Sequence, residues 1–233
     1  MQAQDAVNGK TPSFKDVLLS RYSCRGYLER PVQDMVLEEI LQLAQRTPSW
    51  CNCQPWQVII TSGEATEAFR KAFLEQSQLP PEEPDFPWPT EYKGRHLERR
   101  RECGFGLYGS VGIGRNDASG RLRQERENFR FFGAPHVAIV TVDEALGVYG
   151  AIDAGGYVNN FMMAASAYGV ASIAQASLAS RPNFVRAHFG LPASQCIVCG
   201  ISFGYADANH PANRFRTARA QLHENIQLIG RGA

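Results

Sequence analysis

Apolar residues recur along the chain at the spacings of helices and strands. The first such pattern predicts a helix, because Phe14, Val17 and Leu18 would share one face. Thr11 and Pro12 suit the N-cap and the first helical position of that helix. Helices and strands are predicted in alternation, which is typical of a layered α/β or α+β domain. Further helices are predicted at about 34–44, 65–78, 150–169, 182–190 and 222–228, and strands at 56–61, 136–142, 171–176 and 196–205.

The segment from about 80 to 130 interrupts this alternation. Prolines crowd residues 80–90, where they exclude a regular helix or a central strand. Residues 91–130 are rich in Arg, Glu and Gly, which predicts helical pieces around a glycine-broken middle. We interpret the segment as a lid or arm inserted in one domain spanning 1–233, in preference to a linker between domains.

Composition narrows the class of protein. Of 233 residues, 44% are hydrophobic, and 24 Lys and Arg face 23 Asp and Glu. A net charge of +1 gives no general attraction to nucleic acid or anionic membranes. No apolar run approaches the roughly 20 residues of a membrane span, and the start lacks a secretory signal. Six cysteines are too sparse for a disulfide scaffold, so we expect reduced thiols and a cytoplasmic protein without nucleic-acid or membrane partners.

Several motifs that resemble chemical sites have simpler interpretations. Residues 104–109 match the glycine fingerprint of dinucleotide-binding loops, but a charged helical stretch precedes them where a strand is required. Cys196 and Cys199 lie in an apolar strand pattern, where residues three apart face opposite sides, so we interpret them as core cysteines. The basic stretches 93–101 and 121–130 alternate with glutamates, which favours exposed, salt-bridged helix faces, with an arginine facing a ligand as the alternative. No metal-ligand spacing and no local nucleophile–base pair is present, so we expect no metal and no catalytic side chain.

Two arginine clusters carry a more specific signal. Arg21 and Arg25 flank Ser23 near one end of the chain, and Arg214 and Arg216 lie near the other. A buried dianionic phosphate needs compensating charge and oriented donors, which arginine supplies as a planar fork. Either cluster alone is more typical of an exposed, salt-bridging turn. Their significance depends on the motifs between them.

The ordered set of motifs resembles the FMN-dependent nitroreductase family. The likeness covers nearly the whole chain except 80–130. It consists of R-x-S-x-R at 21–25, P-S-x-x-N-x-Q-P-W at 48–56, D-A-G at 153–155, the segment 169–177, and H-P-A-N-R-F-R at 210–216. The resemblance implies an α+β fold, with a mixed central β-sheet flanked by helices, in an intertwined homodimer. It also implies two FMN sites at the dimer interface, each built from both subunits.

The resemblance also assigns residues to the cofactor. One group would hold the phosphate and the ribityl chain, and Arg25 would lie toward the N1/O2 edge of the flavin, where a fixed cation stabilises the reduced anion. A backbone N–H of Ala176 or Ser177 would contact flavin N5, although Ala174 stands where relatives commonly have proline. The loop at 48–52 would reach the ring from the partner subunit. The implied cofactor-binding set is Arg21, Tyr22, Ser23, Arg25, Pro48, Ser49, Trp50, Asn52, Gln54, Ala176, Ser177, Arg214 and Arg216.

The activity implied by the resemblance is ping-pong hydride transfer through flavin N5. NAD(P)H would reduce FMN, and a nitroaromatic or quinone-type acceptor would then be reduced in the same pocket. We expect Trp50, Cys51 and Tyr108 in the substrate pocket. Trp50 would stack on an aromatic substrate or pack beneath its loop, and its amphipathic ring suits both roles. The alternatives are reductive dehalogenation, enoate reduction or flavin destruction on the same fold, or a flavin-binding protein without turnover.

Overall fold

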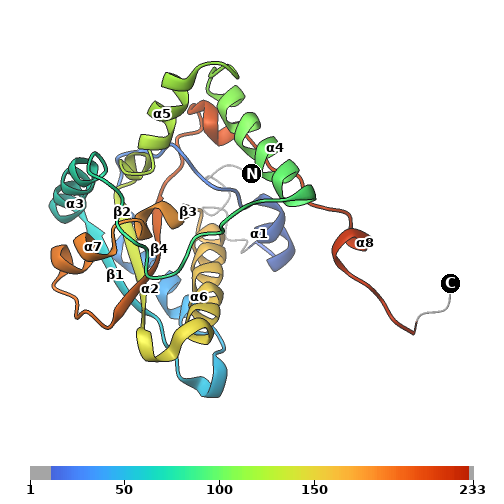
Figure 1. Ribbon diagram of the computed structural model, residues 1–233. Coiled ribbons are helices and arrows are strands. Elements are labelled where there is room, and N and C mark those ends of the chain that lie inside the picture. The colour runs from blue at the N-terminus through green and yellow to red at the C-terminus, as the bar shows by residue number, and fades with distance from the viewer. Residues whose placement is uncertain (1–11, 231–233) are drawn as a thin grey trace.

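A four-stranded antiparallel sheet forms the centre of the computed structural model, which describes residues 12–230 (Figure 1). Its strands lie in the order β1-β2-β4-β3, and the middle pair joins His136 to Phe203. One isolated parallel bridge, from Ser23 to Ser172, supplies the mixed character that the resemblance implied. The strands are β1 (Gln57–Ser62), β2 (His136–Asp143), β3 (Ala171–Gln175) and β4 (Gln195–Gly204).

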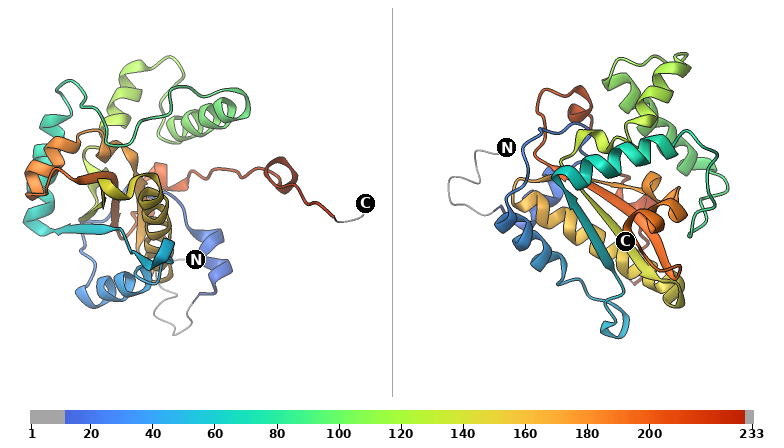
Figure 2. Two further views of the ribbon diagram at one scale, coloured as in Figure 1. Left: turned by 60° about the horizontal axis from the view of Figure 1, so that its bottom comes forward. Right: turned by 90° about the vertical axis from the view of Figure 1, so that its left-hand side faces the viewer.

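Helices cover both faces of the sheet, so the α+β class is confirmed (Figure 2). On one face α6 packs on β2 and β3, with α2 against its outer side. On the other face α3 packs on β1 and β2, and α7 packs on β4. The α-helices are α1 (Phe14–Ser20), α2 (Asp34–Ala44), α3 (Gly63–Gln76), α4 (Gly94–Ser110), α5 (Ala118–Arg126), α6 (Gly147–Ala167), α7 (Pro182–Phe189) and α8 (Leu222–Asn225). Short 3₁₀ helices are η2 (Trp50–Asn52), η3 (Phe131–Gly133), η4 (Glu144–Leu146), η5 (Ala176–Ala179) and η6 (Pro211–Arg214).

The hydrophobic core consists of two clusters, one on each face of β2. Ala138 and Val140 face the cluster formed with α6, whereas Val137 and Ile139 face the aromatic cluster of α3 and α7. Residues 136–142 are therefore buried on both faces. This double burial explains why the strand reads as an unbroken apolar run rather than an alternating one.

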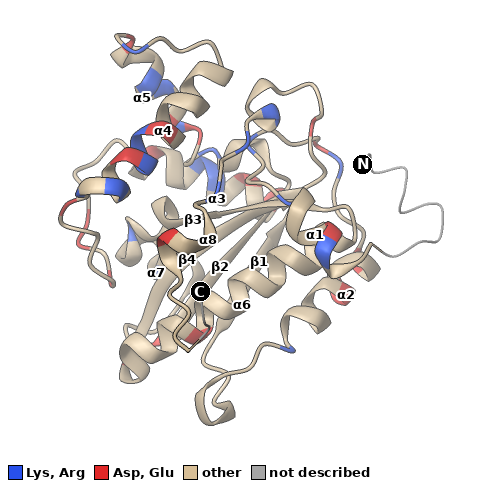
Figure 3. Ribbon diagram, turned by 90° about the vertical axis from the view of Figure 1, so that its right-hand side faces the viewer, with Lys and Arg blue, Asp and Glu red and all other residues tan. Residues whose placement is uncertain are grey.

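The arm formed by α4 and α5 lies outside these layers and carries much of the positive charge (Figure 3). The proline-rich segment before it has no helix or strand, as predicted. Asp85 pairs with Arg186 of α7 at 2.7 Å and accepts the Ile197 backbone N–H at 2.7 Å. Arg181 donates to the carbonyls of Leu79 and Pro80. The start of the arm is thereby anchored to α7 and β4.

Two predicted helices begin or end elsewhere. Pro12 precedes α1, and Thr11 lies outside the described residues. Ser13 is the N-cap, because its hydroxyl accepts the Asp16 N–H while the Asp16 carboxylate accepts the Ser13 N–H, a capping box. At the other end, the predicted helix over 222–228 is only the single turn α8, which is exposed and buries no side chain. A short amphipathic helix without a packing surface gains little stability.

The prediction that Cys196 and Cys199 face opposite sides of the sheet is wrong. Val140 pairs with Cys199 and Thr141 with Ile197, so a β-bulge leaves one extra residue in β4. The bulge shifts the alternation, and both half-buried thiols pack against the α6 cluster. Both are free, and burial raises the pKa of the Cys199 thiol to about 12. These cysteines are packing residues, as predicted, rather than a redox pair.

His136 is expected to make stability depend on pH. Its Nε2 accepts the Val32 N–H at 2.9 Å, and its Nδ1 lies 3.3 Å from the Thr61 carbonyl. Burial lowers the pKa of His136, against an opposing effect of the Thr61 carbonyl. The unfolded chain therefore binds the proton more readily, with a pKa near 6.5. Stability should be complete above about pH 6.5 and decline as the pH falls toward the folded pKa.

Urea unfolding at pH 7.5, 6.5 and 5.5 measures this decline. His136→Asn should lower the unfolding free energy at pH 7.5 by about 1–3 kcal/mol, because buried partners lose hydrogen bonds. The pH dependence should also become flatter than in the wild type. His223→Asn, an exposed change in α8, is the control. An unchanged pH slope in His136→Asn would contradict the assignment.

Candidate functional site

The two ends of the chain meet beside β3 and β4. Ser23 bridges Ser172, and Tyr27 bridges Ala206 just beyond β4. Asn213 connects the two ends, since its Oδ1 accepts the Arg25 N–H at 2.7 Å and its Nδ2 donates to the Gly26 carbonyl at 2.7 Å. The structure therefore brings the arginine clusters from both ends into one place.

The converging arginines form a patch of uncompensated charge. The Arg216 guanidinium lies 3.7 Å from the centroid of the Tyr22 ring. Burial, and then repulsion by Arg219, lowers the pKa of Arg21, and burial lowers the pKa of Arg25. Within residues 12–230, none of these arginines forms an ion pair with a carboxylate: Arg21, Arg25, Arg214, Arg216 and Arg219. Such a patch has the donors and the charge to hold a phosphate.

A buried polar network fixes the turn after β3. Gln175 donates through Nε2 to the Asn128 carbonyl at 3.0 Å, and Ser177 Oγ donates to Asn128 Oδ1 at 3.3 Å. Ser202 Oγ donates to Gln175 Oε1. Ala176 and Ser177, predicted to contact the flavin, begin η5 at this turn. The roles of Asn128 and Gln175 were not predicted from the sequence. A glutamine within an apolar strand pattern was a signal that could have indicated Gln175.

β3 links this turn to the arginine patch. Ser172, beside Ser23, lies near the start of the strand, and Ala176 follows its end. A strand rises about 3.3 Å per residue, so the two positions lie about 13 Å apart. The patch and the turn thus lie at opposite ends of β3.

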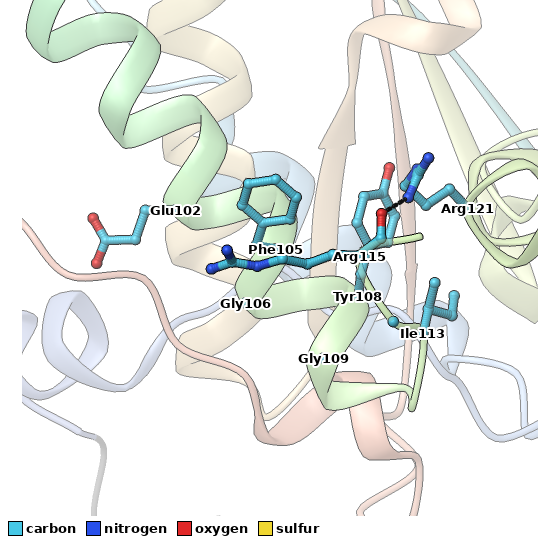
Figure 4. A pocket seen from close by; sticks show the side chains of 9 residues that line it. Glu102, Phe105, Gly106, Tyr108, Gly109, Ile113, Arg115 and Arg121 are labelled. Carbon is cyan, nitrogen blue, oxygen red and sulfur yellow. Dashed lines mark hydrogen bonds between the residues drawn. The ribbon is translucent and has the colours of Figure 1, made fainter. Parts of the chain in front are cut away.

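Two neighbouring cavities lie along α4 and share Glu102 and Gly106 in their linings. One, of about 600 Å³, is lined by Cys103, Phe215, Arg216 and Arg219, and so adjoins the arginine patch. The other, of about 660 Å³, lies between α4 and α5 (Figure 4). Its walls include Tyr108, the arm residue predicted for the substrate pocket.

The glycines of the fingerprint-like motif lie inside α4, where they form no phosphate-binding loop. Gly106 has a packing role. A Cβ on this residue would come within 2.4 Å of the Phe215 ring. The missing side chain therefore lets α4 approach the segment that carries Arg214 and Arg216.

The predicted ring-binding loop lies on the first turns of α6. The Trp50 N–H donates to Asp153 Oδ2 at 3.0 Å, and the indole contacts Tyr149 edge-on at 4.6 Å between ring centroids. Trp50 is still 61% exposed, so it keeps a free surface beyond its contact with Tyr149. Cys51, Asn52 and Gln54 have positive φ values near 50°, and the Gln54 N–H is held by Ser49 Oγ at 2.9 Å. The loop is thus held in a strained backbone conformation.

Within one chain this loop is remote from the arginine patch. Asp153 lies near the start of α6, and the helix rises about 1.5 Å per residue, so about 20 Å separate it from the helix end at Ala167. Ser172, which bridges Ser23, follows beyond that end. Figure 1 places the loop near residue 50 and the arm at opposite ends of the molecule. Trp50 and Cys51 therefore do not meet Tyr108 in one chain.

The described residues contain no helix with the length and apolarity needed to cross a membrane. Between residues 12 and 230, no group of three or more His, Cys, Asp or Glu is arranged to hold a metal ion.

Fold and site together define an α+β protein in which segments near both ends of the chain form one patch of arginines without carboxylate partners among the described residues. Comparison with known proteins identifies the family, because the Nitroreductase family model matches residues 18–205. The chain is 33% identical to "4-nitrobenzoate reductase" of Pseudomonas putida over 220 residues, covering 94% of this chain and 97% of that one. It is 34% identical to "Nitrobenzene nitroreductase" of Ectopseudomonas oleovorans over 226 residues, covering 94% and 98%. The chain belongs to the nitroreductase family.

A solved structure gives the same result for the fold. The FMN-dependent nitroreductase NfnB from Mycobacterium smegmatis, in complex with NADPH, superposes with a TM-score of 0.86 at 32% identity. The match covers 92% of this chain and 96% of NfnB. The resemblance seen in the sequence motifs is therefore confirmed at the level of family and fold.

Gly106→Ala should loosen the contact between α4 and Phe215. The added Cβ has no room at the ring, so the arm should become more accessible to protease between 88 and 101. Gly109→Ala is the control, because nothing lies within 4 Å of its Cβ position and alanine favours a helix by up to about 1 kcal/mol over glycine. Limited proteolysis followed by mass spectrometry compares the two variants. Equal cleavage rates would show that Gly106 has no packing role.

Proposed function

We propose that the protein is an FMN-dependent oxidoreductase that uses NAD(P)H to reduce nitroaromatic or quinone-type acceptors. The observation that carries the proposal is the patch of uncompensated arginines from the two ends of the chain. The names of the two relatives, which specify 4-nitrobenzoate and nitrobenzene, support the acceptor class. NfnB, an FMN-dependent enzyme solved in complex with NADPH, supports the cofactor and the donor.

The arginine patch fits the phosphate end of FMN. Ser23 is half-buried and lies between Arg21 and Arg25 in the segment that Asn213 joins to Arg214 and Arg216. The Ser23 hydroxyl and the guanidinium groups other than that of Arg25 would hold the phosphate and the ribityl chain. The Tyr22 ring would support Arg216 through the cation–π contact described above. No carboxylate among the described residues pairs with these cations, so their charge is available to a bound phosphate.

The ring end of the cofactor would lie along β3, toward the turn at 176–177. Bound there, FMN would supply the hydride-carrying chemistry between NAD(P)H and the acceptor. Arg25, whose backbone N–H is bonded to Asn213, would place a cation at the N1/O2 edge. The Ala176 or Ser177 N–H, held in place through Asn128, would face N5. No side chain of this chain has to act as acid or base, because water can supply protons.

We propose that a second copy of the chain completes the site. The loop with Pro48, Ser49, Trp50, Asn52 and Gln54 would reach the ring from the partner, since it is remote within its own chain. Exposed apolar side chains support such an interface, including Leu19 at 76% on α1 and Ile152 at 60% on α6. The tail beyond Arg216 extends from the body and exposes Ile229 at 88% (Figure 1). In the homodimer these surfaces would be covered.

The whole chain, with the arm as an insertion, would act as one FMN-binding domain. We also propose that the enzyme works in the cytoplasm. All six cysteines are free, which suits a reducing compartment.

FMN binding tests the proposal directly. The purified protein should be yellow and should oxidise NAD(P)H when a nitroarene is added. Arg21→Gln should weaken FMN binding about 10- to 100-fold, since a charge-assisted hydrogen bond contributes about 1.5–3 kcal/mol. Lys15→Gln, which removes an exposed charge from α1, should leave binding unchanged. Fluorescence titration of FMN measures both variants, and a colourless protein that binds no FMN on reconstitution would refute the function.

The dimer is tested by placing a charge on the exposed face of α6. Ile152→Glu should convert the dimer to a monomer in sedimentation velocity and reduce nitroarene reduction at least 10-fold, because each site would lose the partner loop. Leu122→Glu changes an exposed apolar residue of α5 and should alter neither property. A wild-type monomer with full activity would contradict the shared site.

A further inference from the structure

The cavity between α4 and α5 has flat aromatic walls. Phe105 and Tyr108 project from one face of α4, and Ile113 closes the end where the chain turns toward α5 (Figure 4). Phe105 lines the cavity and is 43% exposed, so its ring is accessible to a ligand. The volume of about 660 Å³ lies within the range of sites that enclose a small ligand. The walls suit a planar ring.

Two arginines give this cavity a positive end. Arg115 lies 5.0 Å from the Phe105 ring centroid, and Arg121 donates through Nη1 to the Arg115 carbonyl. Neither guanidinium pairs with a carboxylate in the part of the chain that the structure describes. Glu102 is the one acidic residue in the lining, so the lining carries a net positive charge. Arginine beside an aromatic wall recognises a carboxylate or phosphate attached to a ring.

The turn between the helices sets these arginines in position. Gly112 adopts a φ of +74°, which reverses the chain directly after α4. Asp117 then caps α5, with its Oδ1 accepting the Gly120 N–H at 2.7 Å. The bond from Arg121 to the Arg115 carbonyl closes the turn. The cavity is therefore formed before any ligand arrives.

We propose that this cavity binds an anionic group that is attached to an aromatic ring directly or through a ribose, with Arg115 and Arg121 on the anion and Phe105 and Tyr108 against the ring. The proposal rests on the proposed function and names the class of ligand that the enzyme would select. This cavity has its own arginines, Arg115 and Arg121, and adjoins the cavity beside the arginine patch, with which it shares Glu102 and Gly106 of α4. Two sources share the chemistry: an aromatic carboxylate acceptor, and the adenosine 2′-phosphate of NADPH. In either case the two arginines would bind the anion more tightly than its neutral counterpart.

Isothermal titration of the FMN-saturated protein separates the two sources. Benzoate is compared with benzamide, and adenosine 2′-monophosphate with adenosine. The cavity should bind at least one anion 10-fold or more tightly than its neutral partner, and the pair that shows the preference identifies the source. Arg115→Gln and Arg121→Gln should each abolish the preference. Arg123→Gln, which removes the same charge from α5 outside the lining, should preserve it.

Kinetics provide the second measurement. If the acceptor is the source, Arg115→Gln should raise KM for 4-nitrobenzoate about 10-fold and leave nitrobenzene unchanged. If the donor is the source, the same variant should raise KM for NADPH and leave NADH unchanged. Arg115 is the cleaner variant, since its guanidinium makes no hydrogen bond to another described residue, whereas Arg121 also supports the turn.

The proposal is overturned if neither anion binds more tightly than its neutral partner, or if Arg123→Gln removes the preference as fully as Arg115→Gln. FMN content and nitrobenzene reduction report separately on the proposed function. A yellow, active enzyme without an anion preference would refute this inference alone. If the protein is colourless and binds no FMN, the same titration is run without FMN, and a cavity that still selects an anion would refute the flavin assignment alone.

Discussion

The buried side chain of Asn213 holds together a group of cations that repel one another. Its amide accepts from Arg25 and donates to the carbonyls of Gly26 and Asp207, so three backbone positions from two distant segments depend on it. Asparagine suits this position because it donates and accepts without adding charge. A carboxylate there would neutralise the patch and weaken its attraction for phosphate. The site therefore depends on a neutral residue that keeps the arginines together and their charge available.

The elements and the convergence of the two chain ends could be predicted from the sequence because both leave regular signals. Apolar spacing identified β2 and α6, and the ordered motifs indicated that Arg21 and Arg214 belong to one site. The start of α1 was misplaced because Thr11-Pro12 and Ser13 both suit an N-terminus, and only the contact between Ser13 and Asp16 decides between them. The bulge in β4 left no pattern in the sequence, since it arises from pairing with β2.

Other parts of the site were beyond sequence reasoning for a common physical reason. Asn128 acts through contacts with residues almost 50 positions away, and such contacts depend on how the arm returns to β3. The cavity between α4 and α5 likewise depends on the angle of a turn, which glycine permits without specifying. Tyr108 was singled out as an aromatic residue of the insertion, yet Arg121, which lines the same cavity, fell in a stretch interpreted mainly as an exposed helix face, and Arg115 was not singled out. Residue type alone does not separate a solvated arginine from one beside a ring.

The arm is fastened at both of its ends to the same side of the molecule. Asp85 and Arg181 secure the entering segment to α7 and β4, and Asn128 secures the departing one to the turn after β3. Between these two attachments no named strand sets the length of the polypeptide, although α4 packs against Phe215. Away from that contact, the arm can therefore differ in sequence and length without altering the strand pairing of the sheet.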